Sequence, residues 1–189
     1  MELKKLILPG FLALIMIISV FGIIIGGIND DVEVKEFKGF KYIKTNQGQG
    51  GWAVKMGQST FIFSYAPEEL STLKIPLVTF NDFNSAEKVY LSVNPEEEIG
   101  NIVNILTSGI IPFIAAPVIT ACSKDHEKCS NAPIKNCDDA TASSKVISVE
   151  GTKETRITYI NNCLSINLEP DNTQKYMEGL LFNMLGLNP

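Results

Sequence analysis

Four cysteines and a single histidine are the residues of this 189-residue chain whose types and spacing could do chemistry. Cys122, Cys129 and Cys137 follow one another at short intervals, His126 lies between the first two, and Cys163 comes later. Such residues can form disulfides, hold a metal ion or act as redox nucleophiles. Because thiols stay reduced in the cytosol and oxidise outside it, the compartment of this segment decides between these chemistries.

An even number of cysteines in an extracytoplasmic domain favours two disulfides. Of the three possible connectivities we prefer Cys122–Cys129, which closes a local loop, together with Cys137–Cys163, which ties the segment before one predicted strand to the start of another. In the chain-entropy description each bridge contributes roughly 2–4 kcal/mol, and the longer loop contributes more. Sequence alone leaves the other two connectivities open.

A structural zinc centre is the alternative, with Cys122, His126, Cys129 and Cys137 as its ligands. Their spacing of three, two and seven intervening residues matches no zinc finger or zinc knuckle, and it would leave Cys163 without a role. A redox site is disfavoured because no Cys-x-x-Cys pair occurs. His126 has no Ser or Cys nucleophile in a recognisable frame. Zinc would gain support if this segment were cytoplasmic.

The other residues that attract notice have structural explanations. Asp138 and Asp139 are predicted to form a helix start or a solvated turn, and the acidic residues 96–98 suit the positive end of a helix dipole. Glycines 48, 50 and 51 do not sit between a strand and a helix with Lys-Ser/Thr after them, as a phosphate loop requires. The sequence therefore predicts no catalytic residue, no metal site and no cofactor.

The N-terminal segment sets the compartment. Residues 6–28 are mostly apolar and carry no charge, and this run exceeds the roughly 20 residues that a helix needs to cross a bilayer. Lys4 and Lys5 precede it and acidic residues follow it, so the positive-inside rule places residues 1–5 in the cytoplasm and the rest outside. A cleaved signal peptide is the alternative, although the run is longer than a usual signal core and no Ala-x-Ala site follows.

The sequence after the span predicts one α/β domain (mixed α+β) at 39–189, preceded by a charged juxtamembrane linker at 29–38. Alternating apolar residues predict an antiparallel meander over 40–65. A strand at 89–93, a helix over 94–109 and a strand at 113–120 then predict a βαβ unit with parallel strands. Pro95 in the first helical turn and Gly109 at the end support the helix bounds.

The last third predicts further strands, a hairpin and a terminal helix. A strand is expected at 145–149, and a hairpin pairs 156–159 with 163–168 through a turn at Asn161 and Asn162. Asp171 or Asn172 is expected to cap a final helix with one apolar side, made of Tyr176, Leu180, Met184 and Leu187.

A second uncharged stretch, residues 99–123, could be a second membrane span. Asn101, Asn104, Gly109, Pro112 and Pro117 interrupt it, and polar side chains and prolines are poorly suited to a continuous apolar helix. A buried helix followed by a buried strand explains these interruptions better.

Short motifs along most of the chain support a family resemblance. They are GFKY at 39–42, GW at 51–52, FIFSYAP at 61–67, NCDDA at 136–140, NCLSI at 162–166 and LLFNMLGL at 180–187. In these motifs the chain resembles small single-span membrane-anchored proteins predicted in small-genome archaea. The resemblance implies an externally exposed domain with paired cysteines around Cys137 and Cys163, and it implies no activity.

Charge and composition restrict the function further. The part after residue 28 carries 14 basic and 20 acidic residues, which excludes a nucleic-acid binder driven by bulk charge. We therefore expect a single-pass protein of the cell membrane, held in the bilayer through residues 6–28, whose disulfide-stabilised external domain is a binding, envelope or interaction module with a protein partner at the cell surface. The alternatives are an envelope enzyme, either a thiol oxidoreductase or a hydrolase, and a pilin-like structural subunit.

Overall fold

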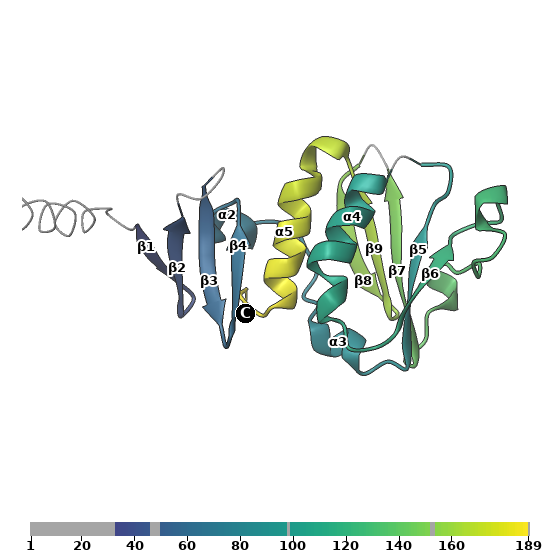
Figure 1. Cartoon of the computed structure of the whole chain (residues 1–189), viewed down its shortest axis with the longest axis horizontal. Helices are drawn as coiled ribbons and strands as arrows, with labels where there is room; N and C mark the ends of the chain where they lie inside the picture. The colour runs from purple at the N-terminus through teal and green to yellow at the C-terminus, as the bar shows by residue number, and fades with distance from the viewer. Residues whose placement is uncertain (1–32, 46–49, 98, 152–153, 189) are drawn as a thin grey trace, which may run out of the picture. The chain divides into compact units, whose positions relative to one another are not determined.

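The structure, a computed structural model, describes residues 33–45, 50–97, 99–151 and 154–188. These residues form a mixed α+β fold with two sheets and four α-helices (Figure 1). The predicted span at 6–28 lies outside the described ranges. Within those ranges no helix is both long and apolar enough to cross a bilayer.

The first sheet, sheet A, is an antiparallel meander with its strands in sequence order. It contains β1 (Val34–Phe37), β2 (Phe40–Thr45), β3 (Gly51–Met56) and β4 (Ser59–Phe63). The predicted alternation is confirmed, because one face buries Tyr42, Trp52, Val54 and Phe63. Lys38 and Gly39 connect β1 to β2 with positive φ angles of 50° and 83°, as a two-residue hairpin turn requires.

Strand β1 corrects the predicted start of the domain. The linker predicted at 29–38 would leave Val34–Phe37 outside the fold, but these residues pair along their whole length with β2. Phe37 also packs against Phe182, with ring centroids 6.4 Å apart. The prediction missed this strand because its sequence contains charged residues, and every second residue of the strand is exposed. The fold therefore begins at Val34 instead of Gly39.

The second sheet, sheet B, has the strand order β6-β5-β7-β9-β8, and only β8 runs antiparallel to its neighbour. Its strands are β5 (Lys88–Val93), β6 (Val118–Cys122), β7 (Ser144–Gly151), β8 (Arg156–Ile160) and β9 (Cys163–Leu168). The predicted βαβ unit is confirmed, since β5 and β6 are parallel neighbours joined by α4 (Gly100–Gly109). The predicted hairpin is also present, with positive φ angles at Asn161 and Asn162.

The start of α4 differs from the prediction. The helix begins at Gly100, and Asn94 instead opens a turn in which the backbone N–H of Glu97 donates to the Asn94 carbonyl oxygen over 3.3 Å. The carboxylate of Glu97 accepts hydrogen bonds from the Asn94 side chain and from the backbone N–H of Gly151 at the end of β7. These bonds favour the turn over another helical turn. The helix and its two flanking residues bury Ile99, Ile102, Leu106 and Ile110, as expected of a buried helix.

The uncharged stretch at 99–123 contributes to the core of sheet B. It contains α4, a single 3₁₀ turn at Ile111–Phe113 and strand β6. The strand predicted at 113–120 is therefore shifted, because Pro112 lies in the 3₁₀ turn and β6 begins only after Pro117. Shorter helices, α2 (Pro67–Ser71) and α3 (Phe80–Asn84), occupy the connection between the sheets.

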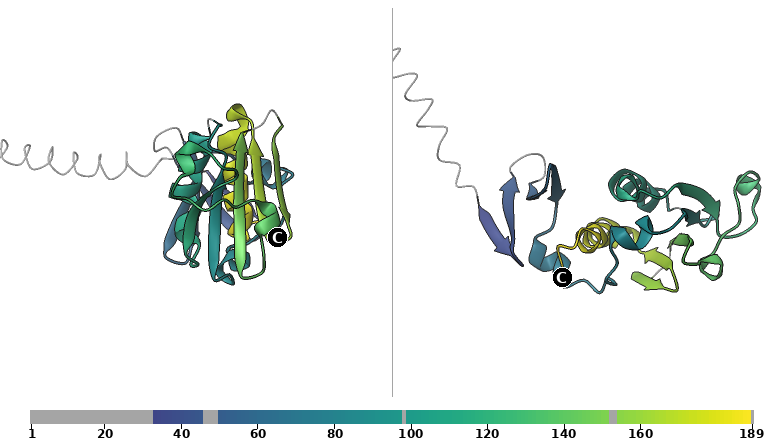
Figure 2. Two further views of the ribbon diagram at one scale, coloured as in Figure 1. Left: turned by 90° about the vertical axis from the view of Figure 1, so that its right-hand side faces the viewer. Right: turned by 90° about the horizontal axis from the view of Figure 1, so that it is seen from below.

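The last helix, α5 (Thr173–Met184), packs against both sheets (Figure 2). Met177, Leu180 and Met184 join the core of sheet B. Phe182 joins the core of sheet A, where its ring lies 5.6 Å from that of Phe63. The prediction of one apolar side was thus too narrow, since α5 is buried on two sides.

A buried carboxylate joins α5 to the end of sheet A. Glu178 is buried, and its Oε2 accepts hydrogen bonds from the backbone N–H groups of Ser64 at 2.7 Å and Tyr65 at 3.3 Å. Its Oε1 accepts a bond of 2.6 Å from the Gln174 side chain. Backbone groups just past β4 therefore depend on this side chain for their hydrogen bonds.

Replacing Glu178 should weaken the whole fold. Glu178→Ala leaves two backbone N–H groups unpaired, and each such group costs about 1–3 kcal/mol. We expect the free energy of unfolding to fall by about 3 kcal/mol, measured by urea unfolding with circular dichroism. Gln174→Ala is the matched control, because it removes a single part-buried bond to Glu178, leaves both backbone N–H groups paired and should cost about 1 kcal/mol. Equal losses in the two variants would contradict this role.

Tyr42 gives a prediction for alkaline pH. Its hydroxyl is buried without a hydrogen-bond partner among the described residues. Burial, with a smaller contribution from the Glu68 carboxylate, raises the pKa of Tyr42 from 10.0 to about 12. The folded chain thus binds the Tyr42 proton more tightly than the unfolded chain does. The contribution of this proton to stability is complete below pH 10 and is lost as pH rises through 12.

Tyr42→Phe should therefore unfold less readily between pH 10 and 12 than the wild type, by up to about 2 kcal/mol. Near pH 8 the variant should match the wild type or exceed its stability by about 1 kcal/mol, because it removes an unsatisfied buried hydroxyl. Parallel urea titrations at pH 8, 10 and 11 measure both effects. An identical loss of stability in both proteins would refute the assignment.

Candidate functional site

The connection from β6 to β7 holds most of the residues that the sequence singles out. We call residues 122–141 the cystine loop. It contains two 3₁₀ turns, Glu127–Cys129 and Cys137–Asp139, and it begins at the carboxyl end of β6. Together with the neighbouring face of sheet B, it forms the candidate site.

Two disulfides hold the cystine loop. Cys122 is bonded to Cys129 and Cys137 to Cys163, with Cα atoms 6.2 Å and 5.3 Å apart, which is the pairing that the sequence favoured. No cysteine is free. The first bridge closes the loop on itself, and the second joins it to the start of β9. A thiol oxidoreductase needs a reactive thiolate, and none of these sulfurs offers one in this state.

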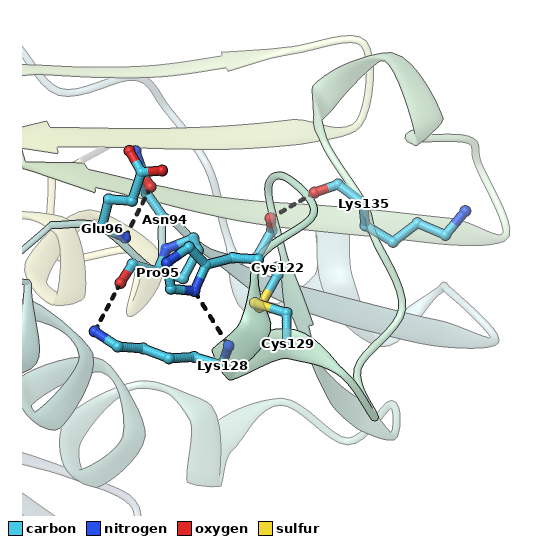
Figure 3. Close-up of a disulfide and its surroundings, with 9 residues drawn as sticks. Asn94, Pro95, Glu96, Cys122, Lys128, Cys129 and Lys135 are labelled. Atoms are coloured by element: carbon cyan, nitrogen blue, oxygen red, sulfur yellow. Dashed lines mark hydrogen bonds between the residues drawn. A yellow bond between two sulfur atoms is a disulfide. The ribbon is translucent and has the colours of Figure 1, made fainter.

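The first bridge sits where the loop folds back along β6 (Figure 3). The backbone N–H of Cys122 donates to the carbonyl oxygen of Pro133, and the N–H of Lys135 donates to the carbonyl oxygen of Cys122 over 2.8 Å. Cys122 and Cys129 are both buried. The returning segment therefore extends the edge of sheet B beyond β6.

His126 caps a turn of the cystine loop. Its Nδ1 accepts a hydrogen bond of 3.1 Å from the backbone N–H of Lys128, at the start of the 3₁₀ turn. The predicted zinc alternative fails on chemistry, because Cys122 and Cys129 are bonded to each other and so offer no thiolate ligand. Among the described residues no three metal-binding side chains gather.

Lysines tie the cystine loop to the turn that follows β5. Lys124 Nζ lies 2.6 Å from Glu96 Oε2. Figure 3 shows the second contact, in which Lys128 Nζ donates to the Pro95 carbonyl oxygen over 3.4 Å. The bond from Lys124 holds the pKa of Glu96 below its ordinary value. Exposed pairs of this kind contribute little to stability, so they orient the loop more than they stabilise the fold.

Asp138 and Asp139 form the predicted turn. Asn136 caps the second 3₁₀ turn, and its own backbone N–H donates to Asp139 Oδ2 over 2.9 Å, which completes a capping box. This bond, with help from Lys135 Nζ at 3.3 Å, holds the pKa of Asp139 below its ordinary value. Both carboxylates are explained by local structure.

The face of sheet B beside the loop carries a row of hydroxyl groups that the sequence analysis missed. Ser92, Ser148, Ser165 and Thr158 lie opposite one another in register on β5, β7, β9 and β8, and we call them the hydroxyl row. Ser92 Oγ donates to the Lys135 carbonyl oxygen, so the loop covers one end of the row. Ser148 is 5% exposed. The only sequence signal was a hydroxyl residue at equivalent positions of four strands.

The usual ligand position of such a sheet is filled by the chain itself. Ligands of open parallel sheets bind at the carboxyl ends of the strands where the strand order reverses, which here is between β5 and β7. Glu97 lies at that point and bonds to Gly151 at the end of β7. Within the part of the chain that the structure describes, the Glu97 side chain therefore occupies this position.

The site supplies hydrogen-bonding and charged groups on a rigid support. Among the described residues, His126 bonds to backbone, no carboxylate or imidazole is hydrogen-bonded to the hydroxyl row, and the carboxylates of Glu96 and Asp139 are paired. Comparisons with protein-family models, curated proteins and solved structures find no match to this chain. The arrangement suits recognition of another molecule better than it suits catalysis.

The two bridges should differ in their effect on stability. Their sequence separations are 26 for Cys137–Cys163 and 7 for Cys122–Cys129. Loop-closure entropy then assigns about 3.5 kcal/mol to Cys137–Cys163 and about 2.4 kcal/mol to Cys122–Cys129. We expect Cys137→Ala/Cys163→Ala to lower the free energy of unfolding more than Cys122→Ala/Cys129→Ala, by about 1 kcal/mol. Urea unfolding compares them, and a larger loss from the local bridge would reverse the ranking.

Proposed function

We propose that this chain is a membrane-anchored extracytoplasmic interaction module. In this proposal residues 6–28 cross the bilayer, residues 1–5 stay in the cytoplasm, and the domain from Val34 onward faces the outside. The domain binds a protein partner at the cell surface through the cystine loop.

The pairing of all four cysteines carries this proposal. Disulfides persist in oxidising compartments and are rare in the cytosol. The chain places every cysteine in a bridge and leaves none free. An external position of the domain is the simplest chemical reason for that usage, and it agrees with the basic residues before the apolar run and the acidic residues after it.

The surface of the loop supports binding. Ile119 on β6 and Ile134 on the returning segment are exposed beside the bridge that joins Cys122 to Cys129. A loop fixed by two bridges loses little conformational freedom when it binds, which favours affinity. Exposed aliphatic side chains next to hydrogen-bonding groups are a normal composition for a protein interface.

Thiol labelling of cells that express the full chain tests the compartment. A membrane-impermeant maleimide should label the wild type in intact cells only after reductant is added. It should label Ser108→Cys without reductant, because Ser108 is exposed on α4 and its new thiol has no partner. Glu2→Cys should be labelled only after lysis.

Three outcomes would contradict the proposal. Labelling of Ser108→Cys only after lysis would place the domain in the cytoplasm. Labelling of the wild type without reductant would show free thiols. Recovery of a shortened chain in the medium would replace the anchor with a cleaved signal peptide.

A further inference from the structure

The outward face of sheet A carries an exposed apolar row. Val34, Ile43, Ala53 and Ile62 lie opposite one another on the four strands, and we call them the apolar row. Val34 is 57% exposed, Ile43 46% and Ile62 60%. The inner face of the same sheet holds the aromatic core, so this row has no role in the fold. Aliphatic side chains aligned across a whole sheet face indicate contact with another apolar surface.

Two lysines lie next to the apolar row on the same face. Lys41, which is opposite Glu36 on β1, lies two residues from Ile43. Lys55, which is opposite Thr60 on β4, lies two residues from Ala53. Both are exposed, and among the described residues neither forms an ion pair. They lie on adjacent strands, β2 and β3, where like charges repel each other. An anionic surface over this face would relieve that repulsion.

Positive charge is concentrated in sheet A, and negative charge in the rest of the domain. Residues 34–65, which contain sheet A, have five lysines and one glutamate, a net charge of +4. Residues 66–189 have nine basic and sixteen acidic residues, a net charge of −7. Sheet A is therefore the basic part of an acidic protein, although its outward face also carries Glu36. A negatively charged partner would meet attraction at this sheet and repulsion elsewhere.

We propose that the outward face of sheet A rests on anionic lipid headgroups, with the apolar row entering the outer part of the bilayer. This proposal rests on the membrane anchor of the proposed function. Only residues 29–33 separate the predicted span from Val34, and an extended segment of that length reaches about 20 Å at most. Sheet A is thus held close to the lipid surface, where exposed aliphatic groups and lysines bind together.

A second copy of the chain is a poorer occupant of this face. Four strands spaced about 4.8 Å apart and about five residues long present roughly 250 Å². A standard protein interface buries about 800 Å² on each partner. Two copies stacked through this face would also bring four lysines, two from each copy, into a dry interface with only the two Glu36 carboxylates to balance them, which is costly.

Fluorescence quenching in vesicles tests the contact with the full chain. The Thr60→Cys chain is labelled with a fluorophore in the absence of reductant. It is then reconstituted into vesicles of phosphatidylcholine, with or without about 30% phosphatidylglycerol, and both kinds of vesicle contain brominated lipid as the quencher. Thr60 is exposed on the outward face, and the four native cysteines are bonded and do not react. We expect strong quenching in the anionic vesicles, weaker quenching in the neutral ones, and loss of the difference at high salt.

Matched variants separate the two kinds of contact. Lys41→Gln/Lys55→Gln should lower the ratio of docked to undocked domain on the order of tenfold in anionic vesicles. Ile62→Ser should lower it in both kinds of vesicle. Ile160→Ser is the control, because Ile160 is also 60% exposed but lies in the β8 hairpin of sheet B. A label at Ser108→Cys on α4 should stay unquenched in every case.

Failure of this proposal can be told apart from failure of the anchor. A chain that alkaline carbonate strips from the vesicles has no anchor, and both proposals then fall. A chain that resists carbonate but shows no quenching at residue 60 keeps its anchor and overturns the lipid contact alone. Efficient cross-linking between two chains through Ile62→Cys would assign the face to a second copy instead.

Discussion

Helix α5 contributes side chains to both hydrophobic cores, so neither sheet can bury its apolar face without it. Sheet A alone is a four-stranded meander with one aromatic face, and such a sheet needs a packing partner to be stable. Phe182 supplies part of that partner, since its ring contacts those of Phe37, Tyr42 and Phe63. The opposite side of α5 completes the core of sheet B. One helix therefore couples the stability of two sheets that share no strand.

This arrangement forces polar groups into the interior. Asn183 lies on α5 between the sheets, and its Nδ2 donates to the carbonyl oxygens of Ile75 and Pro76 over 3.4 Å. Gly179 lies where the same segment crosses the helix, and a Cβ there would lie 2.7 Å from the terminal Cδ1 atoms of Leu73 and Ile75, so both side chains would have to shift. With Glu178 bonded to the end of β4, three residues on two neighbouring turns of α5 are matched to particular segments of the chain. The helix is thus fixed in rotation and in position along its axis.

The sequence predicted those elements whose apolar pattern reflects burial on one side. Strands β2 to β4 and the apolar face of α4 follow such patterns, and the cysteine pairing followed from one local loop and from the strands predicted next to Cys137 and Cys163. Strand β1 was missed because an edge strand with an exposed face can be mostly charged. The start of α4 was misplaced because Glu97 bonds to Gly151, which is distant in sequence. The hydroxyl row was invisible for a similar reason, since it exists only through the register of four strands.

The position of α5 at the end of the chain has a consequence for biosynthesis. Sheet A is synthesised before α5, so the aromatic face of Trp52 and Phe63 stays without its cover until α5 has been made. The second disulfide has the same order, because Cys137 must wait for Cys163. Folding of both sheets is therefore completed only after the C-terminal residues have emerged, and during that interval the uncovered meander is the part of the nascent chain most in need of a chaperone.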